Sequence, residues 1–409
     1  MRALLEESFR AAVAAADPLE ILAPHLPSPP KGRTFVAAAG KAAASMALAA
    51  EKHFQGELEG IAITRYGHGL PTRRIRVIEA GHPVPDEAGE AAAREILSRV
   101  TALNEDDLLL ALLSGGGSSL LSLPAPGVAM ADLKQVTRAL LRSGATIQEI
   151  NTVRKHLSAV HGGRLAAASR APVCALIISD VTGDDPTHIA SGPCAPDPTT
   201  YQDARTVLTR YRVAAPPSVK ARLDAGRDET PKPGDAILSK ASNKVIATAH
   251  RSLEAAAEVF AGKRITPVIL GDAVTGEAAE VAKVMAALVH EVRTRRSPWV
   301  PPVALISGGE CTVTLSGEGG RGGRCAEFLL SLGIETDGIW AIAADTDGID
   351  GSEDNAGAIL TPESMTKGRD GRAHLARHDS YGFFAALGDL VVTGPTRTNV
   401  NDYRAIVVT

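Results

Sequence analysis

Aromatic residues are scarce in this chain: tryptophan, tyrosine and phenylalanine together make up 3% of it. Proteins that bind single-stranded nucleic acid commonly stack bases on aromatic side chains, so that mode of binding is not expected. The formal net charge is -4, and no long run of lysine and arginine is present. The sequence therefore lacks the basic footprint of a nucleic-acid-binding protein, and no nucleic-acid partner is predicted.

Cysteine is also rare, and the chain has no C-x-x-C pair that would suggest a zinc site. The four cysteines are scattered at Cys174, Cys194, Cys311 and Cys325, which favours a reducing compartment. No apolar run approaches the length of a membrane span. The N-terminal stretch MRALLEESFRAAVAAADP contains acidic residues and is typical of an amphipathic helix rather than a signal peptide. We expect a soluble, cytoplasmic protein without a membrane partner, present as a monomer or homodimer.

The length of 409 residues is too great for one ordinary core, so two domains are expected. Strand and helix patterns alternate, which predicts a parallel sheet with helices on both faces. Residues 216–233 contain Pro-Pro, mixed charges and Pro-Lys-Pro-Gly, and they give the best linker pattern in the chain. We therefore predict two α/β domains, residues 1–232 and residues 233–409.

A glycine-rich stretch, Leu109–Leu123 (LLALLSGGGSSLLSL), is the feature around which we interpret the chain. Its apolar part predicts a buried parallel strand at residues 108–113, followed by a loop and then a helix from about residue 118. Glycines let backbone N–H groups approach a ligand, and the helix dipole would favour an anion there. No Gly-Lys-Ser/Thr follows, so the stretch is not a P-loop. The candidates are a phosphate-binding loop or a strand-to-helix turn without a ligand.

Two further groups of polar residues follow predicted strands. Lys41 comes directly after the strand at residues 34–39, where its side chain can reach a ligand at the sheet edge, or lie in solvent. Asp180, Asp184 and Asp185 follow the apolar strand at residues 173–179. Clustered carboxylates are costly without a nearby cation, and Mg²⁺ binds one or two carboxylates together with substrate phosphates. This turn is therefore a candidate magnesium site.

A polar helical face is predicted in the segment INTVRKHLSAVHGGRLA. Its members fall three or four residues apart, which places them on one side of a helix; they are Asn151, Arg154, Lys155 and Ser158. The alternatives are a ligand-binding face and an ordinary solvated helix face.

The pattern Gly317-x-Gly319-x-x-Gly322 formally matches a dinucleotide-binding fingerprint, with Asp345 at the end of the next strand. A hydride-transfer enzyme must therefore be considered. Arg321 and Arg324 in this loop instead suit discrete phosphate or carboxylate groups, because a guanidinium binds them with two hydrogen bonds. No spacing suggests a Ser-His-Asp or Cys-His arrangement. Cationic groups, glycine amides and carboxylates over two domains suit phosphoryl transfer, which depends on positioning and charge neutralisation.

Six sequence strings together resemble the glycerate 2-kinase family, whose members combine an N-terminal glycerate kinase domain with a C-terminal MOFRL domain. They occur in the family's order along nearly the whole chain: LLSGGGSSLL, EINTVRKHLSAVHGGRLA, ISDVTGDDPTHIASGP, ISGGECTVTL with GGRCAEF, DTDGIDG and GPTRTNVND. The resemblance implies a Rossmann-like N-terminal sheet, an α/β MOFRL domain and an active site in the cleft between them. It implies ATP- and Mg²⁺-dependent phosphorylation of D-glycerate to 2-phosphoglycerate. Many members are also labelled hydroxypyruvate reductase, a name to which this sequence gives little chemical support.

The resemblance also implies roles for individual residues. Lys41, Asp180 and Arg324 would be catalytic, and Asp180 and Asp184 would hold the metal. The glycerate-binding set would be Lys41, Arg324, Glu327 and Asp347. The nucleotide-binding set would be Ser114, Gly115, Gly116, Gly117, Ser118, Ser119, Asn151 and Lys155. On this basis Lys41→Ala and Arg324→Ala are each expected to abolish most ATP-dependent activity and to leave folding intact.

The chain departs from the family pattern at two places. Cys325-Ala326 stand where Asn-Gln is usual, and Arg397 stands where glycine is usual. Both are expected near the site, so they bear on substrate preference. Two other functions stay open from the residues alone: an NAD(P)H-dependent hydroxypyruvate reductase, and a non-catalytic sensor of a sugar acid or its phosphate.

Overall fold

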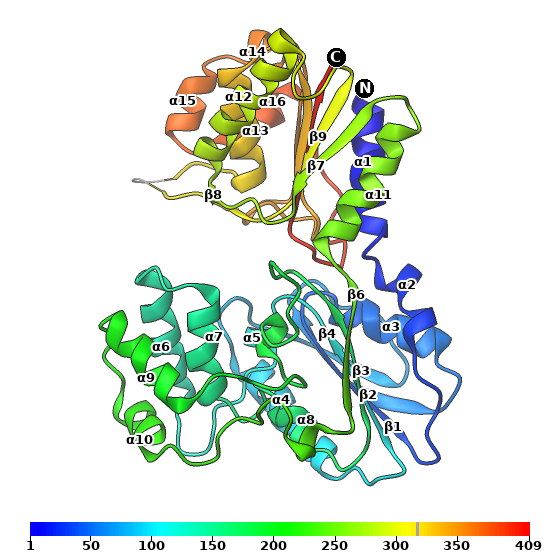
Figure 1. The fold of residues 1–409 in the computed structure, drawn as a ribbon, viewed down its shortest axis with the longest axis vertical. Coiled ribbons are helices and arrows are strands. Elements are labelled where there is room, and N and C mark those ends of the chain that lie inside the picture. The colour runs from blue at the N-terminus through cyan, green and yellow to red at the C-terminus, as the bar shows by residue number, and fades with distance from the viewer. Residues whose placement is uncertain (316–318) are drawn as a thin grey trace. The chain divides into compact units, whose positions relative to one another are not determined.

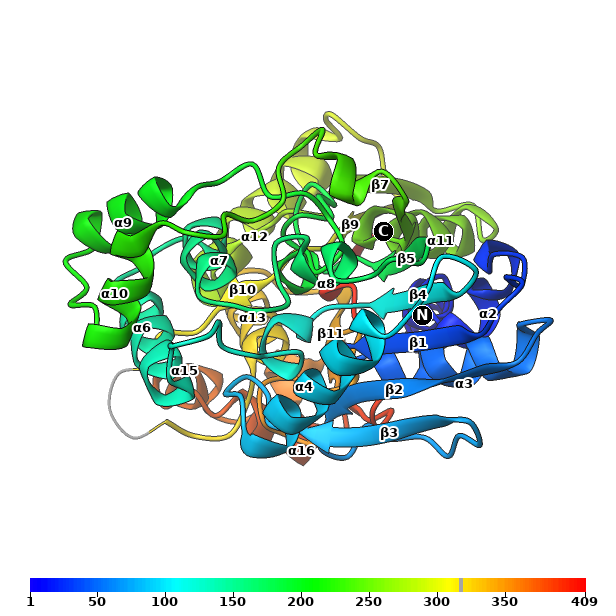
Figure 2. The same ribbon diagram turned by 90° about the horizontal axis from the view of Figure 1, so that it is seen from below.

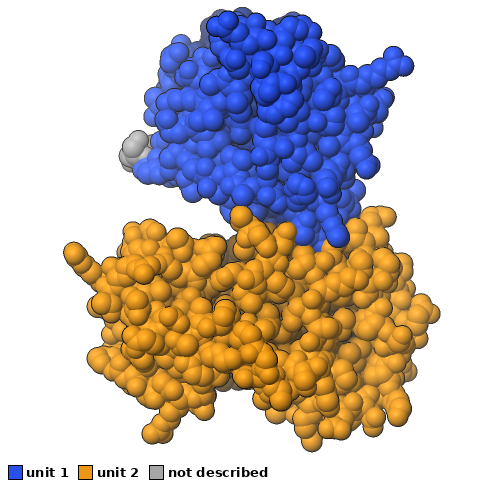
Figure 3. Space-filling model, viewed as in Figure 1, with its two compact units in different colours: residues 1–17, 247–409 blue, residues 18–246 orange. Residues whose placement is uncertain are grey.

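In the computed structural model, which describes residues 1–315 and 319–409, residue contacts divide the chain into two compact units (Figure 3). Unit 1 comprises residues 1–17 and 247–409, and unit 2 comprises residues 18–246. These limits differ from the expected boundary at residues 232 and 233, because the first helix packs with the end of the chain and residues 233–246 pack with the first sheet. That residues 1–232 and 233–409 are separate folding domains stays a prediction.

The described residues of unit 2 form six strands and nine α-helices (Figure 1). The strands are β1 (Thr34–Ala39), β2 (Leu58–Arg65), β3 (Ile75–Ala80), β4 (Leu108–Leu113), β5 (Val173–Ile178) and β6 (Ala241–Ala247). The helices are α2 (Pro18–Ile21), α3 (Ala43–His53), α4 (Glu87–Thr101), α5 (Gly117–Leu120), α6 (Met130–Arg142), α7 (Ile147–His156), α8 (Arg164–Ala167), α9 (Tyr201–Arg210) and α10 (Pro217–Ala225).

The strands of unit 2 form one sheet in the order β3-β2-β1-β4-β5-β6, and the pairings from β3 to β5 are parallel (Figure 2). All residues of β1 and β4 are buried, as expected of strands covered on both faces. Phe35 of β1 packs in one cluster with Ile96 and Val100 of α4. The predicted parallel α/β sheet is confirmed, and β1, β4 and β5 end at the same edge.

The predicted linker at residues 216–233 is wrong for its first half, which forms α10. Proline is well tolerated at the first position of a helix, and Pro217 occupies that position. Val219 and Leu223 lie four residues apart and are buried with residues of α6, α7 and α9. A second apolar cluster, built from α6, α7, α9 and α10, therefore lies outside the sheet.

Unit 1 contains seven helices and eight strands among the described residues. The helices are α1 (Arg2–Ala14), α11 (Ala249–Ala261), α12 (Ala278–Arg295), α13 (Arg324–Glu335), α14 (Ser364–Lys367), α15 (Gly371–Ala376) and α16 (Ser380–Leu387). The strands are β7 (Thr266–Gly271), β8 (Gly276–Glu277), β9 (Val303–Ser307), β10 (Cys311–Thr312), β11 (Trp340–Asp345), β12 (Gly357–Leu360), β13 (Leu390–Val391) and β14 (Asp402–Val408).

The main sheet of unit 1 is mixed, in the order β13-β12-β11-β14-β9-β7. Only the β7–β9 pairing is parallel among those of its described strands. Alternate residues of each strand face opposite sides: Leu305 packs in the cluster that includes α12 and α13, whereas Ile306 packs in the cluster that includes α1 and α11. Both faces of this sheet are therefore covered by helices.

The N-terminal helix α1 has the amphipathic character expected from its sequence. Leu5 and Phe9 are buried in one cluster with Leu253 and Phe260 of α11. Tyr403 of β14 donates a hydrogen bond from its hydroxyl to Ser8 Oγ at 2.8 Å. None of the helices in the described part of the chain combines the length and apolar composition needed to cross a membrane.

Candidate active site

The loops that follow β1 and β4 cross at the edge of the unit 2 sheet. The Lys41 N–H donates to the Gly115 carbonyl at 2.8 Å, and the Ala42 N–H donates to Ser114 Oγ at 3.0 Å. Gly40 has a φ of +131°, and a Cβ at this position would lie 2.1 Å from Ser114 Oγ. Glycine is therefore required where the two loops cross. The crossing places the backbone of Lys41 against the predicted phosphate loop.

Gly116 adopts the left-handed conformation, with φ at +80°. A Cβ on it would lie 2.9 Å from His82 Nε2 and 3.3 Å from Lys41 Cγ. Two basic side chains thus flank the backbone of this glycine. His82 was not assigned from the sequence, although its position just after β3, at the edge where β1 and β4 end, was the available signal.

A chain of polar side chains extends from the glycine loop to α7. Ser118 Oγ lies 2.7 Å from Ser191 Oγ, which donates to Asn151 Oδ1 at 3.1 Å. Arg154 Nη1 donates to the same oxygen at 3.0 Å, and Asn151 Nδ2 donates to the His188 carbonyl at 3.3 Å. The predicted polar face of α7 is therefore turned toward the glycine loop rather than only toward solvent. Arg154 and Ser191 carry no role in the sequence-based assignment.

The turn that carries Ser191 is held in an unfavourable backbone conformation. Ala190, Ser191 and Gly192 have φ values of +51°, +59° and +58°. Non-glycine residues in this region cost of order 1–3 kcal/mol each and persist where the surrounding structure fixes them. A Cβ on Gly117 would lie 2.5 Å from the Ala190 Cβ, so glycine at 117 allows this close contact. Such strain is typical of functional sites.

The predicted helix after the glycine loop is present but short. Helix α5 spans four residues, so its dipole is small. The Gly117 N–H donates to the Ser114 carbonyl at 3.2 Å, and the Ser119 N–H donates to the Gly116 carbonyl at 3.2 Å. These two amides are used within the loop. An anion at this edge would depend more on side chains than the sequence suggests.

Lys155 is buried, with 1% of its side chain exposed, and its Nζ lies 3.4 Å from Asp197 Oδ1. Burial lowers the pKa of Lys155, although Asp197 opposes this shift. Asp197 also accepts hydrogen bonds from the hydroxyls of Thr199 at 2.7 Å and Thr230 at 3.0 Å. The ion pair therefore ties α7 to the segment before α9. A role of Lys155 in nucleotide binding stays a prediction.

Asp180 and Asp184 lie in one turn directly after β5. The Asp184 N–H donates to the Val181 carbonyl at 3.0 Å, which closes the turn. Because β5 is parallel to β4, this turn follows the same edge of the sheet as the glycine loop. Two carboxylates match the donor set of a magnesium ion that is also bound by phosphates. No group of three or more His, Cys, Asp or Glu side chains suited to a metal occurs among the described residues, and a phosphate-bound magnesium does not need one.

In unit 1, the predicted catalytic Arg324 is surrounded by acidic side chains. Its Nε lies 2.9 Å from Asp402 Oδ1, its Nη2 2.5 Å from Asp345 Oδ2 and its Nη1 3.4 Å from Glu310 Oε1. Burial would lower the pKa of Arg324, but Asp402, Asp345 and Glu310 together raise it above its ordinary value. Asp402 is shared with Arg404, at 2.6 Å. The Arg324 guanidinium is therefore paired with three carboxylates, each of which lies at or next to the end of a different strand.

The predicted substrate-binding acids of unit 1 are both buried. Glu327 is 6% exposed, and its Oε2 lies 3.1 Å from His378 Nδ1. Burial raises the pKa of Glu327, although His378 opposes the shift. Asp347 is 2% exposed, and its Oδ1 accepts from the Ile349 N–H at 2.9 Å.

Asp350 caps the start of α13. Its Oδ1 accepts from the Cys325 N–H at 3.0 Å, and its Oδ2 accepts from the Ala326 N–H at 2.9 Å. Burial raises the pKa of Asp350 to about 7, although these two N–H groups oppose the shift. The side chains of Cys325 and Ala326 are fully buried. This departure from the family pattern therefore changes the packing under α13 rather than an exposed surface.

We expect Asp350 to make the stability of unit 1 depend on pH. Its folded-state pKa of about 7 exceeds the ordinary value of 3.8, so the Asp350 carboxyl stays protonated to a higher pH in the folded chain than in the unfolded chain. The free energy of unfolding should therefore fall between about pH 4 and pH 7, by up to about 1.4 kcal/mol per pH unit from this group. Both tryptophans, Trp299 and Trp340, lie in unit 1, so their fluorescence in urea reports this unit.

The comparison is between the wild-type chain, Asp350→Asn and the control Asp337→Asn, since the Asp337 side chain is 96% exposed. The first variant should flatten the dependence of stability on pH, and the control should not. Equal slopes in all three proteins would show that Asp350 does not titrate in this range.

Arg397 adopts the left-handed conformation, with φ at +59°. This explains why glycine suits the position, since glycine adopts such backbone angles without a steric penalty. Arg397 Nη1 donates to the Pro395 carbonyl at 3.5 Å.

The dinucleotide fingerprint does not form a Rossmann half. Gly317 lies outside the described residues. The strand before the pattern, β10, pairs with β8 in a separate two-stranded sheet, whereas β11 after it lies in the main sheet, where β14 separates it from β9 and is antiparallel to both. The fingerprint requires adjacent parallel strands joined by the helix. Asp345, which would bind a ribose, is paired with Arg324.

A parallel sheet whose carboxyl edge carries a glycine loop, a lysine and an acidic turn is typical of an α/β enzyme that binds phosphate groups. Residues 4–224 match a family model described as a domain of unknown function, DUF4147, and residues 303–402 match the MOFRL family. The chain belongs to the glycerate 2-kinase family, and the resemblance noted in the sequence is confirmed. Because the members of this family are kinases, membership in it implies that the chain uses a nucleotide substrate.

Three relatives illustrate the match. A protein from Agrobacterium vitis that is named as a hydroxypyruvate reductase is 50% identical over 100% of this chain and 94% of its own. A glycerate 2-kinase from Pyrococcus horikoshii is 42% identical over 93% of this chain and 88% of its own. The crystal structure of a glycerate kinase from Thermotoga maritima matches with a TM-score of 0.88 at 38% identity, and the match covers 100% of this chain and 99% of that one.

Proposed function

We propose that this protein transfers a phosphoryl group from ATP to the 2-hydroxyl of D-glycerate and forms 2-phosphoglycerate. The observation that carries the proposal is the position of Lys41, the glycine loop and the acidic turn at one sheet edge, in a chain 42% identical to a glycerate 2-kinase. Phosphoryl transfer needs cationic and amide groups around the phosphates and a carboxylate near the attacking hydroxyl. Unit 2 carries all three kinds of group.

In unit 2, we assign the nucleotide phosphates to the loop Ser114–Ser119, and we assign charge neutralisation at the transferring phosphoryl to Lys41. Asp180 would orient the 2-hydroxyl or accept its proton, and with Asp184 it would hold Mg²⁺. The ion, when bound with the nucleotide, offsets phosphate charge. Asn151 supports the loop through Ser191 and Ser118. Lys155 would act indirectly, because its amine is paired with Asp197.

In unit 1, Arg324, Glu327 and Asp347 remain our candidates for binding glycerate. The pairs of Arg324 with Asp345 and Asp402 support a positioning role for this guanidinium. About a fifth of the Arg324 side chain is exposed, at 19%, so one side of it stays accessible to a carboxylate.

The decisive experiment is a product assay. The full chain is incubated with ATP, Mg²⁺ and D-glycerate, and the product is supplied to enolase alone or to enolase with phosphoglycerate mutase. A signal with enolase alone identifies the 2-phosphate and supports the proposal. A signal that requires the mutase identifies the 3-phosphate, and the absence of ADP release would contradict kinase activity.

A second candidate function, the NAD(P)H-dependent reduction of hydroxypyruvate, is favoured by the name of the Agrobacterium relative. Loss of nicotinamide absorbance with NADH and hydroxypyruvate would support it. A third possibility, a sensor of a sugar acid, would bind D-glycerate without ADP release. We propose a cytoplasmic location, supported by four free cysteines, and a monomer or homodimer as the active form.

A further inference from the structure

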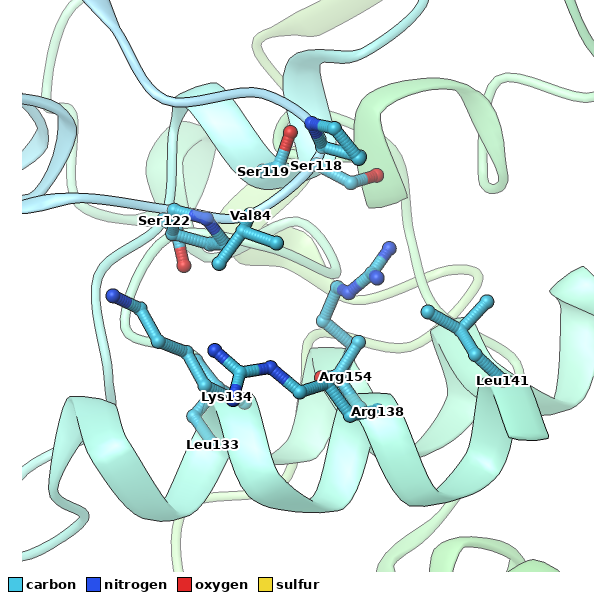
Figure 4. Close-up of a pocket in the computed structure, with 12 residues that line it drawn as sticks. Val84, Ser118, Ser119, Ser122, Leu133, Lys134, Arg138, Leu141 and Arg154 are labelled. Atoms are coloured by element: carbon cyan, nitrogen blue, oxygen red, sulfur yellow. The ribbon is translucent and has the colours of Figure 1, made fainter. Parts of the chain in front are cut away.

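Unit 2 contains a pocket beside the glycine loop, and apart from Ser118 and Ser119 none of the residues that line it was assigned a role from the sequence (Figure 4). One wall is α6, which contributes Leu133, Lys134, Thr137, Arg138 and Leu141. The opposite wall is the turn Pro83–Pro85 together with Ser118, Ser119 and Ser122, and Arg154 of α7 reaches in from the remaining side. The pocket holds about 490 Å³ of empty space, counting the part open to solvent.

The pocket carries positive charge that no carboxylate of the described residues neutralises by direct pairing. Within the described chain, Arg154 makes one hydrogen bond, to the uncharged Asn151 side chain, and forms no ion pair. Burial lowers the pKa of Arg154 to about 10, so the group stays cationic at neutral pH. Arg138 and Lys134 also form no ion pair within the described chain. Burial tends to raise the pKa of Asp86, but the positive charge of nearby Lys134 is among the interactions that lower it. A desolvated guanidinium without a counter-charge is costly, which indicates an anionic ligand.

Hydroxyl groups lie opposite the cations. Ser118 Oγ is fixed 2.7 Å from Ser191 Oγ, and Ser191 is bound to the same Asn151 oxygen that accepts from Arg154. One hydrogen-bonded chain therefore orients Arg154 and Ser118 together. Figure 4 shows the guanidinium of Arg154 directed toward the side of the pocket where Ser118 and Ser119 lie. Arginine and hydroxyl groups on two sides of one space suit the oxygens of a phosphate.

The lining also has an apolar part, in which two large side chains are exposed. Val84 is 46% exposed and Leu141 is 59% exposed, and both line this pocket. A ligand that satisfies the whole lining must have an anionic end and a flat apolar part. Glycerate has one carboxylate and no apolar surface of that size, whereas a nucleotide has both parts.

We propose that this pocket binds the nucleoside triphosphate, with a phosphate group at Arg154 and Ser118 and the base against Val84 and Leu141. The inference rests on the proposed function, in that it names the nucleotide site of the same reaction. It adds Arg154, Arg138 and Lys134 to the residues that the glycine loop supplies. The geometry explains why the short helix α5 does not need a strong dipole: the charge comes from α6 and α7.

The test is equilibrium dialysis of the full chain against ATP, without turnover, for the wild-type chain, Arg154→Gln and the control Arg142→Gln. Arg142 ends α6, is exposed and does not line the pocket. Glutamine keeps a donor for Asn151 but removes the charge. The dissociation constant for ATP should rise about 10- to 100-fold in Arg154→Gln and less than twofold in the control. An unchanged constant in a folded Arg154→Gln protein would overturn the proposal.

A double variant, Lys134→Gln with Arg138→Gln, serves if Arg154→Gln does not fold, because neither side chain is buried. It should weaken ATP binding at least tenfold, and unchanged binding would overturn the proposal. Inorganic tripolyphosphate is the probe for the base. It should bind at least tenfold more weakly than ATP, and Leu141→Asn should reduce that preference. Equal affinity for ATP and tripolyphosphate would show that the base does not bind in this pocket.

Failure of this inference can be distinguished from failure of the proposed function. If the wild-type chain makes 2-phosphoglycerate while Arg154→Gln binds ATP normally, the pocket assignment is wrong and the activity stands. If ATP binding depends on Arg154 but no phosphoglycerate forms, the pocket assignment stands and the acceptor is another molecule. In an active enzyme, Arg154→Gln should raise the KM for ATP and leave the KM for D-glycerate within twofold.

Discussion

Replacing Arg324 with leucine is expected to lower the free energy of unfolding of unit 1 by about 3–5 kcal/mol. Arg324 pairs with Asp402 and Asp345, whose side chains are 0% and 2% exposed. Removing the guanidinium leaves two buried carboxylates close together with less positive charge, although Arg404 still neutralises part of it. The sequence-based expectation that Arg324→Ala leaves folding intact is therefore revised: activity and stability should fall together.

Urea unfolding followed by tryptophan fluorescence measures this effect, because both tryptophans lie in unit 1. The matched control is Arg321→Leu, three residues earlier, whose side chain is 61% exposed and pairs with Glu353. Because the Arg321 guanidinium is largely in solvent, its pair with Glu353 and its stacking on Tyr381 should together contribute about 1–2 kcal/mol, so the control should lose less than Arg324→Leu. Adding Asp345→Asn to Arg324→Leu should restore part of the stability. If the free energy of unfolding falls by less than about 1 kcal/mol in Arg324→Leu, the ion pairs of Arg324 do not make the expected contribution to the stability of unit 1.

Replacing Lys41 with alanine is expected to lower kcat for phosphoryl transfer about 100- to 1,000-fold, the effect of losing one group that stabilises developing charge. The contacts that hold this loop are made by backbone atoms of Lys41 and Ala42. These atoms are unchanged in the variant, so the loop should keep its conformation. Loss of activity in Lys41→Ala should therefore occur without loss of fold, in contrast to Arg324→Leu.

Initial rates with ATP, Mg²⁺ and D-glycerate, together with circular dichroism, measure this prediction. The control is Lys52→Ala, an exposed lysine near the end of α3, the helix that begins just after Lys41. It should retain activity within twofold. If Lys41→Ala retains more than a third of the wild-type rate, Lys41 has no direct part in the reaction.

The strands and the family could be predicted from the sequence alone, because strands are indicated by short apolar runs and the family by short motifs. Apolar runs such as Leu108–Leu113 and Val173–Ile178 leave little choice besides buried strands, and the glycines after β4 mark the sharp turn. Alternating helices predict that these strands are parallel, but only the structure shows that β1 and β4 are neighbours in the sheet. The placement of Lys41 on the glycine loop is then a consequence of two neighbouring strands ending at one edge.

The partners of charged side chains could not be predicted in this way. Arg324 was assigned a ligand-binding role from the family resemblance, and the loop sequence gives no sign of its acidic partners. Its acidic partners come from segments far apart in the sequence: Glu310 precedes β10, Asp345 ends β11 and Asp402 begins β14. Lys155 looked equally available on a helix face and is buried against Asp197, whereas its neighbour Arg154 has no acidic partner in the described chain.

The sequence by itself therefore determined the strands around the glycine loop, the parallel sheet of unit 2 and the family, because each of these is indicated by short contiguous segments. Only the tertiary structure decided that α1 packs on unit 1 with α11, that residues 217–225 form a helix rather than a linker, and which cations stay unpaired. The physical reason is that amphipathicity shows that a face must be buried without indicating its partner. A side chain's charge likewise shows that it needs a counter-charge, and long-range packing determines whether the protein or a ligand supplies it.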